Sequence, residues 1–259
     1  MADDGTLLFL VNRSGAGTAI LLNVLSRDYQ IWRTAGTEAP FRESVAELLR
    51  EAGAPTGPVR VEAKVLGEET HRRVGACEIH RFRLGDAEYV GLIRMAKTRP
   101  DDMIFLADNR PKPVWIQFPQ AVHVYDVRRG VYRGCVERFD DVLYPGRTEF
   151  FALLPYEVRG LDVRREPIVG GVRITARVEP RGDREPTTHL LRMEVFDPTG
   201  NPRRELARNV LAENGAVVQE IFIGFGVSGK WRVRVKDVAT GTLWEDTFEH
   251  ADPAPTAAR

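Results

Sequence analysis

The sequence has only two cysteines, Cys77 and Cys135, and neither belongs to a Cys-x-x-Cys pair or lies near a cluster of histidines. This spacing argues against a zinc site. It favours two buried or half-buried thiols, with a disulfide between them as the alternative. Net charge is also lacking, because lysine plus arginine and aspartate plus glutamate both number 37. Without an overall field, neither a nucleic acid nor a membrane is expected as a partner.

Long apolar runs are absent as well. The longest run near the start, Leu7 to Val11, is too short for the core of a signal peptide and follows the acidic residues Asp3 and Asp4. The sequence therefore shows no export signal and no transmembrane segment, and the compartment stays undecided. A length of 259 residues with 43% apolar residues is typical of a folded protein of two or three domains.

The first part of the chain predicts a hairpin followed by one helix. Two apolar segments flank Asn12 to Gly17, whose Gly-x-Gly we interpret as a hairpin turn, because a phosphate-binding loop would need a helix to begin there. From Pro40, apolar residues recur at helical spacing, and Gly53 suits the end of that helix. Its apolar face is made by Phe41, Val45 and Leu48. Two strands and a helix bury little apolar surface, so this face is expected to pack on a sandwich or on another chain.

After a linker at 54–58, side chains alternate between apolar and polar almost everywhere, as in strands with one dry and one wet face. Many short strands separated by Gly, Pro, Asp and Asn favour antiparallel sandwiches. The predicted fold is mainly β: two immunoglobulin-like antiparallel β-sandwiches after a small αβ segment. The predicted parts are 1–57 for the αβ segment, 58–156 and 157–250 for the sandwiches, and 251–259 for a disordered tail. Residues 156–171 are interpreted as the join between the sandwiches.

One type of corner recurs three times. An alternating strand runs into an Asp whose carboxylate can accept backbone N–H groups just ahead, and a Gly follows where the chain needs a positive φ. The pairs are Asp126 with Gly130, Asp197 with Gly200, and Asp237 with Gly241. These residues are predicted to be structural turns and not reacting groups.

Several segments resemble known proteins. Residues 12–23, Tyr29, Arg33 and the helix ending at Gly53 resemble the end of the amidotransferase-like module of microbial β-galactosidases, which serves trimerisation in that family. Residues 82–93, 122–130 and 151–156 are similar to the C-terminal sandwich of the same enzymes. Residues 195–202 and 229–241 resemble an immunoglobulin-like module of bacterial surface and secreted proteins. The resemblance implies an accessory region of a glycoside hydrolase whose parent is secreted.

The sequence departs from that family in one respect. The catalytic barrel, which would precede Met1, is missing, so the resemblance implies a C-terminal piece or a separately encoded remnant. The expected partners are then an upstream catalytic domain, or a second copy bound through the Phe41, Val45 and Leu48 face.

Few residues suggest chemistry. The histidines are scattered, and only His71 and His80 could meet across a hairpin. Asp101-Asp102 and Asp140-Asp141 could hold calcium, although solvated loop acids are the favoured interpretation. Ser14 and Ser228 lack the Gly-x-Ser-x-Gly elbow of a hydrolase. No catalytic residue, metal ligand or cofactor is therefore assigned.

Aromatic side chains leave sugar binding open. Trp231 alternates in phase with Val233 and Val235, which predicts a place in the core. Trp115 and Tyr125 are out of phase with their apolar neighbours and are the candidates for an exposed aromatic surface that contacts carbohydrate or a neighbouring domain. The favoured function is a non-catalytic accessory module with a structural or assembly role. A carbohydrate-binding module acting in its own right is the alternative, and an independent hydrolase is the third.

Overall fold

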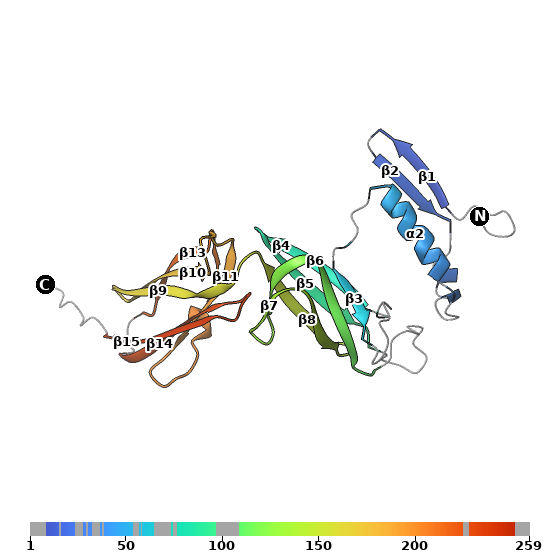
Figure 1. Ribbon diagram of the computed structural model, residues 1–259. Coiled ribbons are helices and arrows are strands. Elements are labelled where there is room, and N and C mark those ends of the chain that lie inside the picture. Colours follow the sequence, from blue (N-terminus) through green and yellow to red (C-terminus); the bar gives the residue numbers. More distant parts are fainter. Residues whose placement is uncertain are drawn as a thin grey trace. The chain divides into compact units, whose positions relative to one another are not determined.

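The computed structural model describes residues 9–15, 17–23, 28–29, 31–32, 37, 39–53, 57, 59–64, 74, 77–96, 109–224 and 228–251. Within them the chain is mainly β, with several antiparallel sheets and one long helix, as the sequence predicts (Figure 1). The candidates His71, Asp101 and Asp102 lie outside the described residues. In the described part of the chain, no helix is long and apolar enough to cross a membrane.

Contacts divide the chain into two compact units. The first comprises 1–78, 93–117 and 140–147, and the second comprises 79–92, 118–139 and 148–259. The predicted parts, in contrast, are continuous segments of the sequence. They are 1–57, 58–156, 157–250 and 251–259, and they stay predictions.

The αβ segment has the expected elements. Strand β1 (Phe9–Ser14) pairs antiparallel with β2 (Gly17–Leu22), and helix α2 (Ala39–Glu51) lies alongside them (Figure 1). The ring of Phe41 stands 5.5 Å from that of Phe9, 5.6 Å from Tyr29 and 5.2 Å from Trp32. Aromatic rings of its own segment thus pack against Phe41, which is half-buried. Packing of the Phe41, Val45 and Leu48 face on a sandwich or on another chain stays a prediction.

The strands between residues 60 and 154 form one six-stranded sheet with the order β3-β6-β8-β5-β4, and β7 pairs with β6. The strands are β3 (Arg60–Ala63), β4 (Cys77–Leu84), β5 (Ala87–Arg94), β6 (Lys112–Asp126), β7 (Val131–Leu143) and β8 (Thr148–Leu154). The longest of them is β6, with 15 residues.

The last part of the chain is a sandwich of two hydrogen-bonded sheets. One sheet has the order β13-β10-β9 and the other has the order β12-β11-β14-β15. Its strands are β9 (Val158–Ile168), β10 (Gly171–Pro180), β11 (His189–Phe196), β12 (Arg208–Ala212), β13 (Ala216–Phe222), β14 (Gly229–Asp237) and β15 (Leu243–His250). The interpretation of residues 156–171 as a join is wrong for most of its length, because β9 pairs along β10 from Val158 to Ile168.

A large buried core runs through the second unit. It contains Tyr125 and Leu154 from the six-stranded sheet together with Ile174 of β10 and Trp231 of β14. Trp231 is fully buried, as its phase in the strand predicts. Because these residues belong to one cluster, the two β regions share buried apolar surface where they meet, and that meeting place is the junction described next.

Candidate functional site

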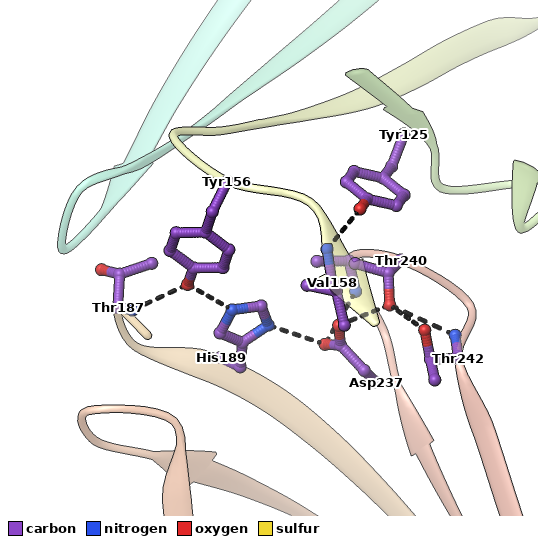
Figure 2. A network of polar contacts seen from close by, with 9 residues as sticks. Tyr125, Tyr156, Val158, Thr187, His189, Asp237, Thr240 and Thr242 are labelled. Carbon is purple, nitrogen blue, oxygen red and sulfur yellow. Dashed lines mark hydrogen bonds and ion pairs between the residues drawn. The ribbon is translucent and has the colours of Figure 1, made fainter. Parts of the chain in front are cut away.

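The junction is built by the ends of strands. Tyr156 follows β8, His189 opens β11 and Asp237 closes β14, so three separate segments bring polar side chains to one place (Figure 2). Both His189 and Asp237 are fully buried, and Tyr156 is almost so. Buried polar groups are tolerated only when they are hydrogen-bonded, so the partners of these three groups decide what the site can do.

The three side chains form a continuous chain of hydrogen bonds (Figure 2). His189 Nδ1 lies 3.1 Å from Asp237 Oδ1, and His189 Nε2 lies 2.8 Å from the hydroxyl of Tyr156. A carboxylate can only accept, so Nδ1 carries the proton toward Asp237, and in the neutral ring Nε2 accepts from Tyr156. The Tyr156 oxygen in turn accepts the backbone N–H of Thr187 at 2.7 Å. Every polar atom named here has a partner.

The Asp237 carboxylate is also held from its own corner. The Thr240 hydroxyl donates to Oδ2 at 2.6 Å, and the backbone N–H of Ala239 points to Oδ1 at 3.3 Å. Thr242 extends this set, since its N–H donates to the Thr240 oxygen at 3.2 Å (Figure 2). The corner that the sequence marks by Asp237 thus orients the carboxylate that binds His189.

Tyr125 lies at the same junction and not on the surface. Its side chain is 3% exposed, and its hydroxyl accepts the backbone N–H of Val158 at 2.7 Å (Figure 2). The expectation of an exposed Tyr125 is therefore wrong. Strand alternation does place it opposite Val124, but at the end of β6 both faces are covered, and Val124, Tyr125 and Asp126 are all buried.

Two of the three corners touch each other at the junction. Gly130 and Gly241 have φ angles of +63° and +79°, and a Cβ atom on Gly241 would lie 2.6 Å from the Gly130 Cα. The carboxylate of Asp126 accepts the N–H of Arg129 at 3.0 Å, and its backbone oxygen accepts the N–H of Gly130 at 2.8 Å. The close approach therefore needs glycine at position 241. A Cβ on Gly130 would lie 3.6 Å from the Gly241 Cα, an ordinary contact, so at that position the positive φ is what favours glycine.

The third corner is exposed and lies elsewhere in the second sandwich. Asp197 Oδ1 accepts the N–H groups of Thr199 and Asn201, both at 3.0 Å, and Gly200 has a φ of +86°. Apart from Gly200 itself and its two chain neighbours, no described residue has an atom within 4 Å of the place where a Gly200 Cβ would stand. The three corners therefore share a local hydrogen-bond pattern but differ in their surroundings.

The protonation states at the junction favour hydrogen bonds that join segments over an activated hydroxyl group. Burial raises the pKa of Tyr156 and of Tyr125 to about 12 in each case, so both phenols keep their protons at neutral pH. An Asp–His pair next to a hydroxyl resembles the arrangement that activates a nucleophile. Here the hydroxyl is buried and already bonded to two partners, so its hydrogen bonds join segments.

Trp115 stands apart from the junction. It lies on the opposite face of β6 from the buried residues Val114 and Ile116, is half-buried, and has Lys64 Nζ 6.0 Å from its ring centroid. Trp115 thus has the outward position that its phase predicts, whereas Tyr125 does not. The two residues belong to different compact units.

The remaining candidates show no shared site. Both thiols are free, with Cys77 half-buried and Cys135 exposed. Asp140 pairs with Lys64, and Asp141 accepts the N–H of Val142. Among the described residues, no three His, Cys, Asp or Glu side chains are placed to hold a metal ion. Ser14 ends β1 and Ser228 precedes β14, both at exposed positions.

Sequence reasoning missed Tyr156 and treated His189 as one of five scattered histidines. The available signal was the buried-strand pattern around His189, where a polar ring opens a strand whose residues Leu191, Met193 and Val195 face inward. No pattern in the sequence connects His189 to Tyr156 or Asp237, because 33 and 48 positions separate them from it.

Comparisons with known proteins give only distant likenesses. No protein-family model and no curated protein matches the chain. A β-glucuronidase of Ruminococcus gnavus is 8% identical with a TM-score of 0.23, and the alignment covers 64% of this chain and 35% of the enzyme. A β-glucuronidase of Dictyoglomus thermophilum is also 8% identical with a TM-score of 0.23, covering 76% of this chain and 44% of the enzyme. The chain spans less than half the length of these glycoside hydrolases, and likenesses of this strength carry no argument about its activity.

Proposed function

We propose that the chain is a non-catalytic accessory region in which β regions are joined into one connector, with a structural or assembly role. The observation that supports this proposal is the buried hydrogen-bond chain from Asp237 through His189 to Tyr156. It uses the polar groups of the junction to fasten segments that are far apart in the sequence. A connector with a shared core keeps its parts in a fixed relation, which is what an attached catalytic domain or a second copy would require.

An attachment to a glycoside hydrolase belongs to the same proposal. It is supported by the resemblance of residues 12–23, 82–93, 122–130 and 151–156 to accessory regions of β-galactosidase-like proteins. The partner would be a catalytic domain encoded upstream or a second copy of this chain.

Scanning calorimetry tests the connector. If the junction couples the β regions of the second unit, their strands unfold in one transition whose calorimetric and van't Hoff enthalpies agree. In the double variant Tyr156→Phe, His189→Leu, we expect that transition to broaden or split. A separate transition of the first unit is compatible with the proposal, whereas separate unfolding of 158–250 and of the other strands of the second unit in the unmodified chain would contradict it.

An activity assay tests the non-catalytic part. Purified full-length chain is incubated with p-nitrophenyl glycosides of glucose, galactose, glucuronic acid and xylose. The release of p-nitrophenol is followed by its absorbance. We expect the rate to equal that of buffer. Turnover that grows in proportion to protein concentration and survives further purification would favour the independent hydrolase.

Carbohydrate binding through Trp115 is the second candidate, because this ring lies outside the core face of β6. Affinity electrophoresis in gels that contain soluble polysaccharides compares the full chain with Trp115→Ala. Retardation that the substitution abolishes would support this candidate, and equal mobility of both proteins would reject it.

A further inference from the structure

A second aromatic cluster lies beside the junction and takes no part in its hydrogen-bond chain. The ring of Tyr132, on β7, packs against the buried ring of Tyr125 at a centroid distance of 4.8 Å and an interplanar angle of 33°. It also lies 5.9 Å from the ring of His123 at an interplanar angle of 14°, and its hydroxyl is 2.7 Å from His123 Nδ1. Tyr132 is 37% exposed, so one large aromatic side chain is presented to solvent while two neighbours hold it in place.

Charged groups stand next to this cluster. The N–H of Val158 bonds to the Tyr125 hydroxyl, which brings the preceding residue, Glu157, to the aromatic rings. Glu157 forms an ion pair with Arg181 at 3.6 Å, and its backbone oxygen accepts the Arg181 N–H at 2.7 Å. Burial raises the pKa of Tyr132, and the carboxylate of Glu157 raises it further, which is consistent with this proximity.

We propose that Tyr132 and His123 form a platform for one pyranose unit of a neutral glycan, with Glu157 and Arg181 as hydrogen-bonding groups at its rim. The chemistry of a pyranose matches the cluster in two ways. Its apolar C–H face packs on an aromatic ring, and its hydroxyl groups need both acceptors and donors, which a carboxylate and a guanidinium supply.

The construction of the cluster favours a small ligand. Tyr132 is fixed by its hydrogen bond to His123 and by its contact with the ring of Tyr125, so little side-chain freedom is lost when a ligand binds. The paired charges of Glu157 and Arg181 balance, which argues for a neutral sugar and against a strongly charged one. A stable protein interface would need about 800 Å² on each partner, far more than one ring and two rim groups offer.

This platform is distinct from Trp115 and does not rest on the proposed connector role. The connector is judged by coupled unfolding, whereas the platform is judged by binding of a soluble sugar. The connector proposal can therefore fail while the platform proposal holds, and the reverse is equally possible.

Saturation-transfer NMR with the full chain tests the platform. The probes are the α and β methyl glycosides of glucose, galactose, mannose and xylose at millimolar concentration. We expect transfer to the ring protons of at least one glycoside, and loss of that signal in Tyr132→Ala with at least about a tenfold fall in affinity, or about 1.4 kcal/mol. Tyr132→Phe keeps the ring and is expected to retain most of the binding, whereas Glu157→Gln is expected to weaken it.

The control variant is Val131→Ala, which changes the neighbouring exposed side chain of the same strand. Thermal unfolding of each variant shows whether the fold is kept. Absence of transfer to all eight glycosides overturns the proposal, and so does transfer that Tyr132→Ala leaves unchanged. A change in mass by light scattering upon Tyr132→Ala would indicate a protein contact at this patch and would equally overturn it.

Discussion

Gly241 and Gly200 have similar backbone conformations, with φ angles of +79° and +86°, but different surroundings. A Cβ on Gly241 would stand 2.6 Å from the Gly130 Cα, whereas a Cβ on Gly200 would meet nothing within 4 Å. The same substitution at the two positions therefore separates the cost of backbone strain from the cost of forcing two corners apart.

We expect Gly200→Ala to lower the free energy of unfolding by about 1 kcal/mol, because alanine disfavours a positive φ. Gly241→Ala should lower it by about 3 kcal/mol or more, since the corner must also shift away from Gly130. Urea unfolding followed by tryptophan fluorescence measures both values. Equal losses in the two variants would mean that the corners do not press against each other.

Tyr156 offers a second comparison at this scale. Its hydroxyl bonds to His189 Nε2 and to the N–H of Thr187, both at the buried junction. Tyr156→Phe leaves those two groups without their partner, so we expect a loss of about 1–3 kcal/mol in the free energy of unfolding. The exposed Tyr144 provides the control, and Tyr144→Phe should change stability by less than about 0.5 kcal/mol. Similar small effects at both positions would show that the hydrogen-bond chain contributes little.

At the scale of elements, the Asp126 corner links β6 to β7 and predicts a pH effect. Burial by itself raises the pKa of Asp126, but the N–H of Arg129 and the guanidinium groups of Arg129 and Arg133 outweigh it, so the pKa is lowered below its ordinary value of 3.8. A lowered pKa in the folded state means that the carboxylate stabilises the fold above about pH 3.8. This stabilisation is lost as the pH falls through the lower folded value.

Asp126→Asn removes this charge while keeping the shape of the side chain. We expect the difference in unfolding free energy between the unmodified chain and this variant to be largest near pH 6 and to shrink steadily below about pH 4. Denaturant unfolding of both proteins from about pH 3 to about pH 6 measures this difference in unfolding free energy. If the unfolding free energies of the two proteins differ by the same amount at every pH, Asp126 is not stabilised as a carboxylate.

The elements that the sequence predicts are those with a regular period. The alternation of Val172, Ile174, Ala176 and Val178 indicates β10, and the spacing of Phe41, Val45 and Leu48 indicates α2. Strand β7 escaped this reasoning, because Gly134 and the acidic pair Asp140-Asp141 interrupt its pattern. Strand β9 carries Pro167 and several charged side chains, which suggest a connection rather than a strand. An edge position in the β13-β10-β9 sheet explains how β9 tolerates them.

At the scale of the whole molecule, the junction is where reasoning from local pattern fails. Alternation assigns each strand one dry face, yet Tyr125 is buried on the face that should be wet, since a second β region covers it. The Asp237 corner is readable from its own residues, but its use as an anchor for His189 depends on a contact between distant segments. Local chemistry thus predicts the turns, and only tertiary packing determines that two of them meet.

Self-association is a further property of the whole molecule, and it stays a prediction with two candidate surfaces. The sequence suggests the helix face of Phe41, Val45 and Leu48 as the contact, but Phe41 already packs on rings of its own segment. Leu10 and Leu21 pair across the hairpin and are 53% and 63% exposed. Phe9 faces the helix, so alternation places these two leucines on the opposite face of β1 and β2.

If this hairpin face binds a second copy, Leu21→Glu should shift the mass measured by light scattering toward that of the 29.1 kDa monomer. A charge on the strand's other face, Thr18→Glu, is the matched control and should leave the mass unchanged. Leu48→Glu tests the helix face in the same way. A mass that responds to Leu48→Glu and not to Leu21→Glu would return the contact to the helix. A monomer at all concentrations would assign the assembly role to the attached partner, because the chain then has no contact with itself.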